Sequence, residues 1–540
     1  MTTNVLRFLE NRAKFRPDGI AVTEGERNIT YGKLLEDSRR IGSALGAATV
    51  PTEPPVASAI KAEDDFKYRT GKESEQGVNS PDGCPGEVHR PIGVYMEKGI
   101  DALSAFFGIV YSGCCYSMLN PELPEKRLAG IGAVLQIKAV VTHKRRKEQA
   151  ERLFPEAEVF CVEDLRRHAA NDAFLASIRE NSVDTDPLYI NFTSGSTGIP
   201  KGIVVSHRSV IDFITCFTDI FHITAEDVIA NQAPFDFDVS VKDIYSAMYT
   251  GAKLVIVPRE LFSAPARLID YLCEKKVTVL IWAVSALCLI STFHGLDYRT
   301  PQSIRKILFS GESMPFRHLC EWRKHLPDAL YANLYGPTEI TCNCTYHILE
   351  KDRDYTDGIP VGKHFPNEDV FLLNEEGCRI TQAGETGRIL VRGTALALGY
   401  YRLPEKNAVQ FIQNPLQQNY PEPVYDTGDL GMYNERGELM FLGRSDNQIK
   451  HMGHRIELEE IERAMNRVNG VDHSVCIFDR KKDRLKGFYT GTATREEIIR
   501  ILEDTLPVYM IPGFIRKMDQ MPLTKNGKTD RRKVLEMCGG

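Results

Sequence analysis

The sequence predicts an α/β protein that carries a smaller, separate C-terminal domain. Over most of the 540 residues, short apolar runs of strand length alternate with longer segments whose apolar residues have helical spacing. The apolar and charged fractions, 42% and 26%, are those of a chain that folds around a buried core. The length is that of several domains, or of one large domain with an appendage.

Four apolar runs in the first part of the chain have the character of buried strands: Ile92–Tyr95, Ala139–Thr142, Lys253–Val257 and Lys306–Phe309. Segments with helical spacing lie between them, most clearly Asp101–Tyr111 and Arg267–Lys275. Strands that alternate with helices in this way form a parallel sheet covered by helices. We therefore expect helix-covered parallel sheets here.

From about Pro360 the pattern becomes that of antiparallel strands. We expect such strands at Val370–Leu373, Gly387–Val391 and Glu438–Phe441. The first of them is followed by the turn residues Asn374–Gly377. This part of the chain is therefore expected to form an antiparallel sheet.

The last stretch of the chain alternates helix and strand on a smaller scale. A helical stripe of apolar residues is formed by Ile461, Ala464, Met465 and Val468. Ser474–Phe478 has strand character, and Thr494 with Glu497 predicts a capping box for a helix that runs to Leu506. These features predict a small α+β domain.

The predicted domain boundary lies in the polar stretch Gly443–Asn447. We expect an N-terminal domain of residues 1–445 and a mobile C-terminal domain of residues 446–540, hinged at Asp446. Within the first, residues 51–90 are rich in proline, glycine and charge and poor in aromatic residues, so they cannot bury much apolar surface. We interpret them as a flexible surface insertion, and a docking loop is the alternative.

Composition and charge exclude several classes of protein. The formal net charge of −6 argues against nucleic acid as a partner. The longest apolar stretch, Val279–Phe293, is broken by serines and is shorter than the ~20 residues of a membrane helix. The charged N-terminus has no signal-peptide core. The 13 cysteines are scattered without a CxxC pair, which indicates reduced thiols in a cytoplasmic protein without a membrane partner.

The strongest local motif is TSGSTGIPKG, residues Thr193–Gly202, between two apolar runs. Its small residues let backbone N–H groups approach an anion, its hydroxyls add donors, and Lys201 adds a positive charge. The motif therefore predicts a phosphate-binding loop. It differs from a Walker A motif because Pro200 precedes Lys201 and Gly202 follows it. A flexible turn is the alternative that composition alone allows.

Four further motifs follow along the chain. Tyr335–Glu339 (YGPTE) places an aromatic ring, a hydroxyl and a carboxylate beside a tight turn, and these groups can stack on a purine and hold Mg²⁺. Asp429, which ends the sequence YDTGD, can accept two hydrogen bonds from a ribose, with an Asx turn as the alternative. The remaining motifs are Gly443–Lys450 with Gly453–Glu457, and the basic loop Leu523–Lys528.

In this order and spacing, the five motifs resemble those of the adenylate-forming superfamily, and within it nonribosomal peptide synthetase adenylation domains and stand-alone D-alanine–carrier-protein ligases. The resemblance extends from the first residues to Lys533, apart from the 51–90 insertion. It implies a large domain of stacked α/β subdomains with a small distorted β-barrel, followed by a small, mobile α+β domain. It also implies ATP and Mg²⁺ as cofactors.

The resemblance implies a role for each motif residue. The residues expected to bind ATP are Thr193, Ser194, Gly195, Ser196, Thr197, Gly198, Lys201, Tyr335, Thr338, Asp429, Arg444 and Lys528. The expected catalytic residues are Lys528, Glu339 and Thr197. Glu339 is also the expected Mg²⁺ ligand, Asp446 the hinge, and Gly453 part of a thiol tunnel. Met452 departs from the arginine that usually precedes this glycine.

By the same resemblance, Asp238 pairs with the α-ammonium group of an amino acid, and Phe237 gates the path of the substrate carboxylate. The alternative is that Asp238 caps a helix that begins near Val239. The other expected pocket residues are Val239, Lys242, Ile281, Leu308, Ser310, Gly311, Leu334, Cys342 and Asn343.

Lys242 has three alternatives in the sequence. It pairs with an acidic side chain of the substrate, it forms an ion pair with Asp243 or another carboxylate of the chain, or it is exposed. The pocket as a whole favours a small or polar amino acid, namely alanine of either hand, serine, aspartate or glutamate.

The resemblance therefore implies a two-step ligase. An amino-acid carboxylate attacks the α-phosphorus of ATP, pyrophosphate leaves, and the aminoacyl group then passes to a phosphopantetheine thiol. Because no carrier module follows Lys533, we expect a separate carrier protein as the acceptor. The alternatives are an acyl- or aryl-CoA synthetase for an organic acid, against which Asp238 argues, and a non-catalytic sensor of nucleotide or amino acid.

Overall fold

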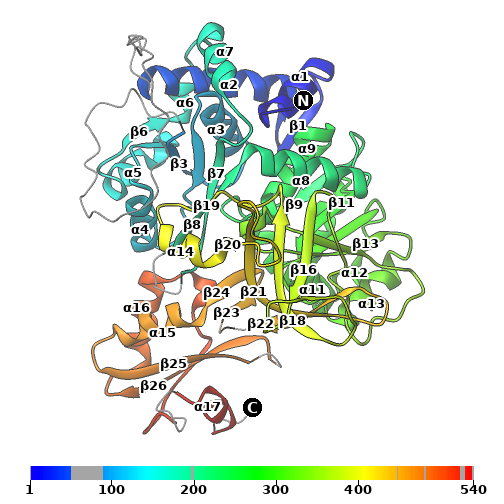
Figure 1. Cartoon of the computed structure of the whole chain (residues 1–540). Coiled ribbons are helices and arrows are strands. Elements are labelled where there is room, and N and C mark those ends of the chain that lie inside the picture. Colours follow the sequence, from blue (N-terminus) through cyan, green and yellow to red (C-terminus); the bar gives the residue numbers. More distant parts are fainter. Residues whose placement is uncertain are drawn as a thin grey trace.

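The computed structural model describes residues 2–49, 89–195, 200–444, 446, 448–479, 482–522 and 529–537. Of the predicted 51–90 insertion, only His89 and Arg90 fall in these ranges. The predicted α/β class is confirmed, because two helix-covered sheets precede an antiparallel sheet and a C-terminal α+β lobe (Figure 1).

The first sheet has seven strands in the order β19-β8-β7-β4-β3-β5-β6. The strands are β3 Pro91–Tyr95, β4 Cys115–Met118, β5 Ala139–Thr142, β6 Glu158–Cys161, β7 Pro187–Thr193, β8 Lys201–Ser206 and β19 Gly399–Tyr400. From β7 to β6 the pairs are parallel, whereas β8 and β19 are antiparallel. The helices of this part are α1 Leu6–Phe15, α2 Tyr31–Thr49, α3 Ile100–Tyr111, α4 Glu125–Leu135, α5 Lys147–Leu153, α6 Val162–Leu165 and α7 Asp172–Asn181.

The second sheet has nine strands in the order β15-β14-β13-β12-β11-β9-β10-β1-β2, parallel from β13 to β1 and antiparallel at both edges. The strands are β1 Ile20–Glu24, β2 Arg27–Thr30, β9 Val228–Asn231, β10 Lys253–Ile256, β11 Val279–Ala283, β12 Lys306–Ser310, β13 Leu330–Tyr335, β14 Thr345–Ile348 and β15 Lys363–His364. Its helices are α8 His207–Ile220, α9 Val239–Thr250, α10 Pro265–Glu274, α11 Val284–Thr292, α12 Gly295–Tyr298 and α13 Phe316–His325.

The third sheet is antiparallel and stands where the resemblance places a small β-barrel. Its strands are β16 Glu368–Leu373, β17 Arg379–Ile380, β18 Thr386–Gly393, β20 Phe411–Gln413, β21 Pro423–Tyr433 and β22 Leu439–Arg444, with α14 Pro404–Gln410 beside them. The predicted turn closes where the N–H of Gly377 donates to the carbonyl of Asn374. We call everything up to residue 444 the large lobe.

The small lobe comprises the described residues from Asp446 onward. Its elements are β23 Gln448–His451, β24 His454–Glu457, α15 Leu458–Asn466, β25 Val471–Asp479, β26 Arg484–Gly491, α16 Arg495–Thr505, β27 Phe514–Lys517 and α17 Arg531–Met537. The predicted capping box at Thr494 and Glu497 is present. In the described chain, no hydrophobic cluster joins residues from both lobes. This separation supports the predicted boundary near Asp446, which stays a prediction.

The two helix-covered sheets share one buried core, and this core fixes α9. The hydroxyls of Tyr116 on β4 and Tyr245 on α9 lie 2.9 Å apart within it. Phe107 of α3 packs edge-on against the Tyr245 ring. Because α9 is held from both sheets, the residue at its N-terminal end is held as well. Among the described helices, none is long and apolar enough to cross a membrane.

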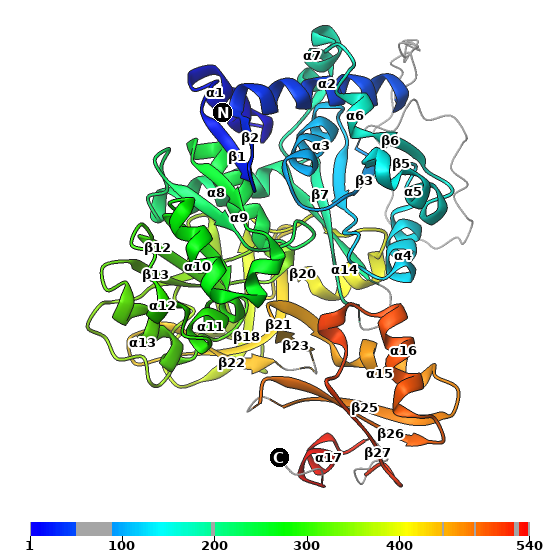
Figure 2. The same cartoon turned by 180° about the vertical axis from the view of Figure 1, so that it is seen from behind.

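The small lobe lies at one end of the molecule in both views (Figures 1 and 2). Ion pairs contribute to its contacts with the large lobe. Arg127 of α4 donates to Glu460 of α15 at 2.7 Å, and both side chains are buried. Lys126 and Asp504 form a second, exposed ion pair between α4 and α16. The two lobes are therefore held in one arrangement by charges that a rotation would separate.

The start of α8 predicts a pH dependence of stability. The Nδ1 atom of buried His207 accepts a hydrogen bond from the Val5 N–H at 3.3 Å, and burial lowers the pKa of His207 to about 3. The imidazole is neutral when folded but takes a proton below about pH 6.5 when unfolded, so its stabilising effect is lost as the pH falls from about 6.5 toward 3. Between pH 7 and pH 5 the loss is roughly 2 kcal/mol.

Urea unfolding at both pH values measures this effect. We expect the His207→Gln variant to lose less stability than the unchanged protein between pH 7 and pH 5. An equal loss in the two proteins contradicts the assignment to His207.

Candidate active site

The carboxyl ends of the parallel strands β9, β11, β12 and β13 meet at one edge of the second sheet. There Ala283, Ser310 and Leu334 lie in one row of the register. Ligands of open α/β sheets bind outside such strand ends. One buried cluster joins α9 to four of the predicted pocket residues, Ile281, Leu308, Leu334 and Cys342. Val239, another of them, is buried as the first residue of α9.

Asp238 is a buried carboxylate at the start of α9, with 6% of its surface exposed. The alternative that its side chain caps the helix is wrong, because it makes no capping hydrogen bond. No cation of the described chain forms an ion pair with it within 4.0 Å. Burial raises the pKa of Asp238, and a hydrogen bond from Thr338 and the charge of Lys242 oppose this effect.

Lys242 follows one helical turn later and is completely buried. Its Nζ atom donates to Oδ1 of Asn343 at 2.6 Å and lies 3.3 Å from Oγ of Ser310. The alternative of an exposed side chain is therefore wrong. So is the ion pair with Asp243, since no described carboxylate lies within 4.0 Å of this ammonium group.

The chain between β13 and β14 folds back tightly, and this brings Cys342 and Asn343 to the same place. A side chain at Gly336 would lie 2.5 Å from the Cα of Asn343, so only glycine fits there. Thr341 and Cys342 have φ angles of +51° and +78°. The thiol of Cys342 donates to the carbonyl of Asp238 at 3.0 Å.

Glu339 is fully buried and accepts from groups of both lobes. Nη1 of Arg455 lies 2.9 and 2.7 Å from its two oxygens, and the Tyr400 hydroxyl donates to Oε1 at 2.7 Å. The ammonium group of Lys201 is 3.6 Å away. Burial acts to raise the pKa of Glu339, but Arg455, Lys201 and the Tyr400 hydrogen bond outweigh it and hold the pKa at about 2.

The contacts of Glu339 determine whether Mg²⁺ can bind at the predicted site. A carboxylate suits Mg²⁺, but both oxygens of Glu339 are already taken by Arg455, so the ion does not fit the carboxylate in this arrangement of the lobes. The surface group Asp297, Glu321 and His325 has the spacing of metal ligands, yet its atoms already bond to one another.

The predicted adenine, ribose and hinge residues form one chain of contacts. The Tyr335 hydroxyl donates to Oδ2 of Asp429, and Nη1 of Arg444 donates to Oδ1 of the same carboxylate at 2.6 Å. Arg444 also donates to both oxygens of Asp446, from Nε at 2.6 Å and from Nη2 at 2.7 Å. The state of the ribose site is thus linked to the residue about which the small lobe is expected to turn.

The small lobe reaches the site through the hairpin of β23 and β24. Its two-residue turn, Met452–Gly453, has φ angles of +53° and +79°, and the Gly453 N–H donates to Glu312 at 3.1 Å. A Cβ added at Gly453 would lie 3.1 Å from that of Ala283, and one at Gly311 would lie 3.6 Å from the Cα of Gly453. The expected tunnel residue thus faces the predicted pocket.

Several residues of this hairpin carry contacts that sequence reasoning did not assign. The Lys450 ammonium group lies 5.5 Å from the centre of the Tyr335 ring. The His454 ring stacks on Tyr509 and lies 5.2 Å from the ring of Phe237. Arg455, Tyr400 and Glu312 were missed as well. The available signal was the place of Lys450, His454 and Arg455 inside the fourth motif.

The phosphate-binding loop is described in part. Thr193 ends β7, Ser194 and Gly195 follow it, and Lys201 begins β8. Ser196, Thr197 and Gly198 lie outside the described residues. The buried hydroxyl of Thr193 has no hydrogen-bond partner in the described chain, and that of Ser194 donates to the Arg455 carbonyl at 2.7 Å. Burial lowers the pKa of Lys201 to about 8.

Lys528, the predicted catalytic lysine, also lies outside the described residues. In the described arrangement, the cations of the small lobe that reach the site are Lys450 and Arg455.

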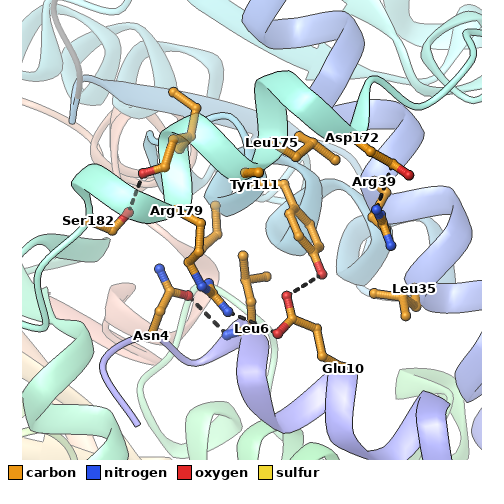
Figure 3. Close-up of a pocket in the computed structure, with 13 residues that line it drawn as sticks. Asn4, Leu6, Glu10, Leu35, Arg39, Tyr111, Asp172, Leu175, Arg179 and Ser182 are labelled. Atoms are coloured by element: carbon orange, nitrogen blue, oxygen red, sulfur yellow. Dashed lines mark hydrogen bonds and ion pairs between the residues drawn. The ribbon is translucent and has the colours of Figure 1, made fainter. Parts of the chain in front are cut away.

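A cavity of about 340 Å³ lies elsewhere, between α1, α2, α3 and α7 (Figure 3). Its polar groups pair with one another: Tyr111 donates to Glu10 at 2.9 Å, and Arg39 to Asp172 at 2.6 Å. None of the predicted site residues lines it. The strand-end site is therefore the candidate active site.

Comparison with known proteins agrees with this fold. The family model described as AMP-binding enzyme matches residues 85–401. Bacitracin synthase 1 of Bacillus licheniformis is 32% identical over 539 residues, which are 98% of this chain but only 9% of that protein. Tyrocidine synthase 1 of Brevibacillus parabrevis is 28% identical over 543 residues, which are 99% of this chain and 45% of that protein. The chain thus spans less than half the length of either relative.

Two solved structures share the fold. The Vibrio cholerae adenylation domain AlmE, in complex with glycyl-adenosine-5'-phosphate, superposes with a TM-score of 0.80 at 19% identity, covering 100% of this chain and 98% of that one. PA1221, a protein with adenylation and PCP domains, has a TM-score of 0.79 at 21% identity, covering 99% and 84%.

The Arg455–Glu339 contact predicts how firmly the lobes are docked. Removing one partner of a buried charge pair costs on the order of 2 kcal/mol or more, so Arg455→Met is expected to weaken docking. Brief digestion with trypsin measures this, because cleavage at Arg444 and Lys450 requires the hairpin to leave the site. We expect faster cleavage in Arg455→Met than in the control Arg516→Met, which alters an exposed residue. Equal rates refute the role of this contact.

Proposed function

The chain belongs to the AMP-binding enzyme family of adenylate-forming ligases, and we propose that it activates an amino acid with ATP and passes the aminoacyl group to the phosphopantetheine thiol of a carrier protein. The two solved structures support this proposal by analogy, since one holds an aminoacyl-adenylate and the other a carrier domain.

The observation that carries the proposal is the buried, unpaired carboxylate of Asp238. A carboxylate removed from water needs a positive partner, and the described chain offers it none within 4.0 Å. The α-ammonium group of an amino acid supplies that charge at the strand ends. A fatty or aryl acid has no such group, so it leaves Asp238 unpaired, and this disfavours the CoA-synthetase alternative.

In the first step, a substrate carboxylate oxygen forms a bond to the α-phosphorus of ATP as the bond to pyrophosphate breaks. We assign the phosphates to the 193–198 loop and Lys201, the adenine to Tyr335, the α-phosphate to Thr338 and the ribose to Asp429. The unused hydroxyl of Thr193 supports this assignment. Two anions must meet in this step, so a mobile cation, Lys528, is proposed to neutralise the developing charge.

The described arrangement suits the second step better than the first. Arg455 occupies Glu339 and the 452–453 turn faces the substrate pocket. We propose that the small lobe turns about Asp446 between the steps. Mg²⁺ is proposed to bind Glu339 only when Arg455 has withdrawn.

ATP–pyrophosphate exchange tests the substrate class. We expect exchange with an amino acid and none with the same acid lacking its amino group. Asp238→Asn is expected to lower kcat/KM by roughly 10²-fold, because the bound ammonium group loses its buried counter-ion. Asp219→Asn, on the exposed side of α8, is the matched control. Exchange that is indifferent to the amino group disproves the proposal.

The second step is tested by a glycine at the hairpin turn. Gly453 and Gly377 share a φ of +79°, but only Gly453 has neighbours within 4 Å of an added Cβ. Gly453→Ala is therefore expected to slow acyl transfer to a holo carrier protein about tenfold while exchange continues, since crowding of this kind costs about 1–3 kcal/mol. Gly377→Ala carries the same backbone strain without the crowding.

Mass spectrometry of the carrier and of free CoA gives the transfer rates. Equal effects of the two glycine variants on acyl transfer count against a thiol tunnel at Gly453. Acylation of free CoA without acylation of the carrier protein contradicts the proposed acceptor.

A further inference from the structure

Lys242 is a buried lysine of the candidate site that has no counter-ion among its described neighbours. It lies in the first turns of α9, it is completely buried, and its described hydrogen-bond partners are two neutral oxygens, those of Ser310 and Asn343. An ammonium group has three donors, so a third N–H remains for another acceptor.

The surroundings of Lys242 disfavour its charge in three ways, although the charges of Cys342, Asp238 and Asp243 partly oppose the effect of burial on its pKa. Burial removes its hydration and lowers its pKa. The nearby N-terminal end of α9 carries a positive partial charge, which repels a cation. No described carboxylate lies within 4.0 Å to compensate. A lysine kept here for stability alone therefore lacks the counter-ion that stability requires.

Neither neighbouring carboxylate, Asp238 or Asp243, lies within ion-pair distance of Lys242. Asp243 accepts from Nδ2 of Asn231 at 2.8 Å, and Asn231 in turn accepts from Lys98 at 3.1 Å. This network contacts Asn231, the last residue of β9, whereas Oδ1 of Asp243 is buried without a hydrogen-bond partner among the described residues. Asp238 faces Thr338. A ligand carboxylate is therefore the group that can bring a negative charge within ion-pair distance of Lys242.

We propose that Lys242 binds a second carboxylate of the substrate, so that the amino acid activated here is an acidic one. Its α-ammonium group pairs with Asp238 and its side-chain carboxylate with Lys242. This inference rests on the proposed function and names its substrate class.

The spacing and walls of the site suit such a substrate. Asp238 and Lys242 are four residues apart, so their side chains leave the same face of α9, and their charged groups form no ion pair within 4.0 Å, which leaves room for a ligand that carries both charges. The Asn343 amide group and the Ser310 hydroxyl are further donors for the same carboxylate. Leu308 and Leu334, which belong to the same buried cluster as α9, supply apolar surface for the methylene groups of such a substrate.

Pyrophosphate exchange with matched pairs of amino acids tests the inference. We expect kcat/KM for aspartate or glutamate to exceed that for asparagine, glutamine, alanine and serine by roughly 10²-fold or more, whichever hand is used. Lys242→Met, which keeps the length of the side chain without its charge, is expected to lose that preference and to favour the neutral amide. Lys242→Arg is expected to retain it. Lys147→Met, on the exposed face of α5, is the control.

A change of specificity separates this role from a structural one, because a merely destabilised variant loses activity on all substrates alike. Binding of non-hydrolysable acidic and neutral aminoacyl-adenylate analogues, measured by calorimetry, gives the same comparison without turnover. Efficient use of neutral amino acids with rejection of acidic ones overturns this inference and leaves the proposed function standing. Exchange with no amino acid of either hand overturns the proposed function itself.

Discussion

One constraint organises this protein: charges that are buried between two lobes must find partners there. Glu339 is the centre of that constraint, because it is fully buried and its partners come from the large lobe (Lys201 and Tyr400) and from the small lobe (Arg455). A buried carboxylate that has lost a cation must replace it. The carboxylate expected to hold Mg²⁺ therefore also serves as the docking point of the hairpin, and the two uses exclude each other.

The same constraint applies on the substrate side of the site, where one buried group is negative and another is positive. Asp238 and Lys242 are a buried anion and a buried cation on one face of α9, and neither has an ion-pair partner within 4.0 Å in the described chain. A helix fixed from both sheets through Tyr245 keeps them apart. Under our proposal, an acidic amino acid would neutralise both groups at once, and the site would select its substrate by charge and by length together.

Much of the fold could be read from the sequence because strand and helix patterns are local. The runs at 139–142 and 370–373, and the capping box at Thr494, lie within elements of the structure. Contacts between distant segments could not be read in this way. Arg455 is separated from Glu339 by 116 residues, and although it lies inside the fourth motif, nothing in the local pattern shows that it reaches Glu339. The sequence likewise predicts a tight turn at Tyr335–Glu339, but not that the chain after it folds back and brings Asn343 against Lys242.

The most direct test of alternation at Glu339 holds the lobes in the described arrangement at a place away from the site. Lys126 and Asp504 form an exposed ion pair between α4 and α16, so cysteines at these positions can be joined by a reducible thiol crosslinker. We predict that the linked protein loses pyrophosphate exchange, still transfers a preformed aminoacyl-adenylate to a carrier, and regains exchange on reduction. Full exchange in the linked protein would show that the hairpin and the first step occupy the site together, and would contradict the account.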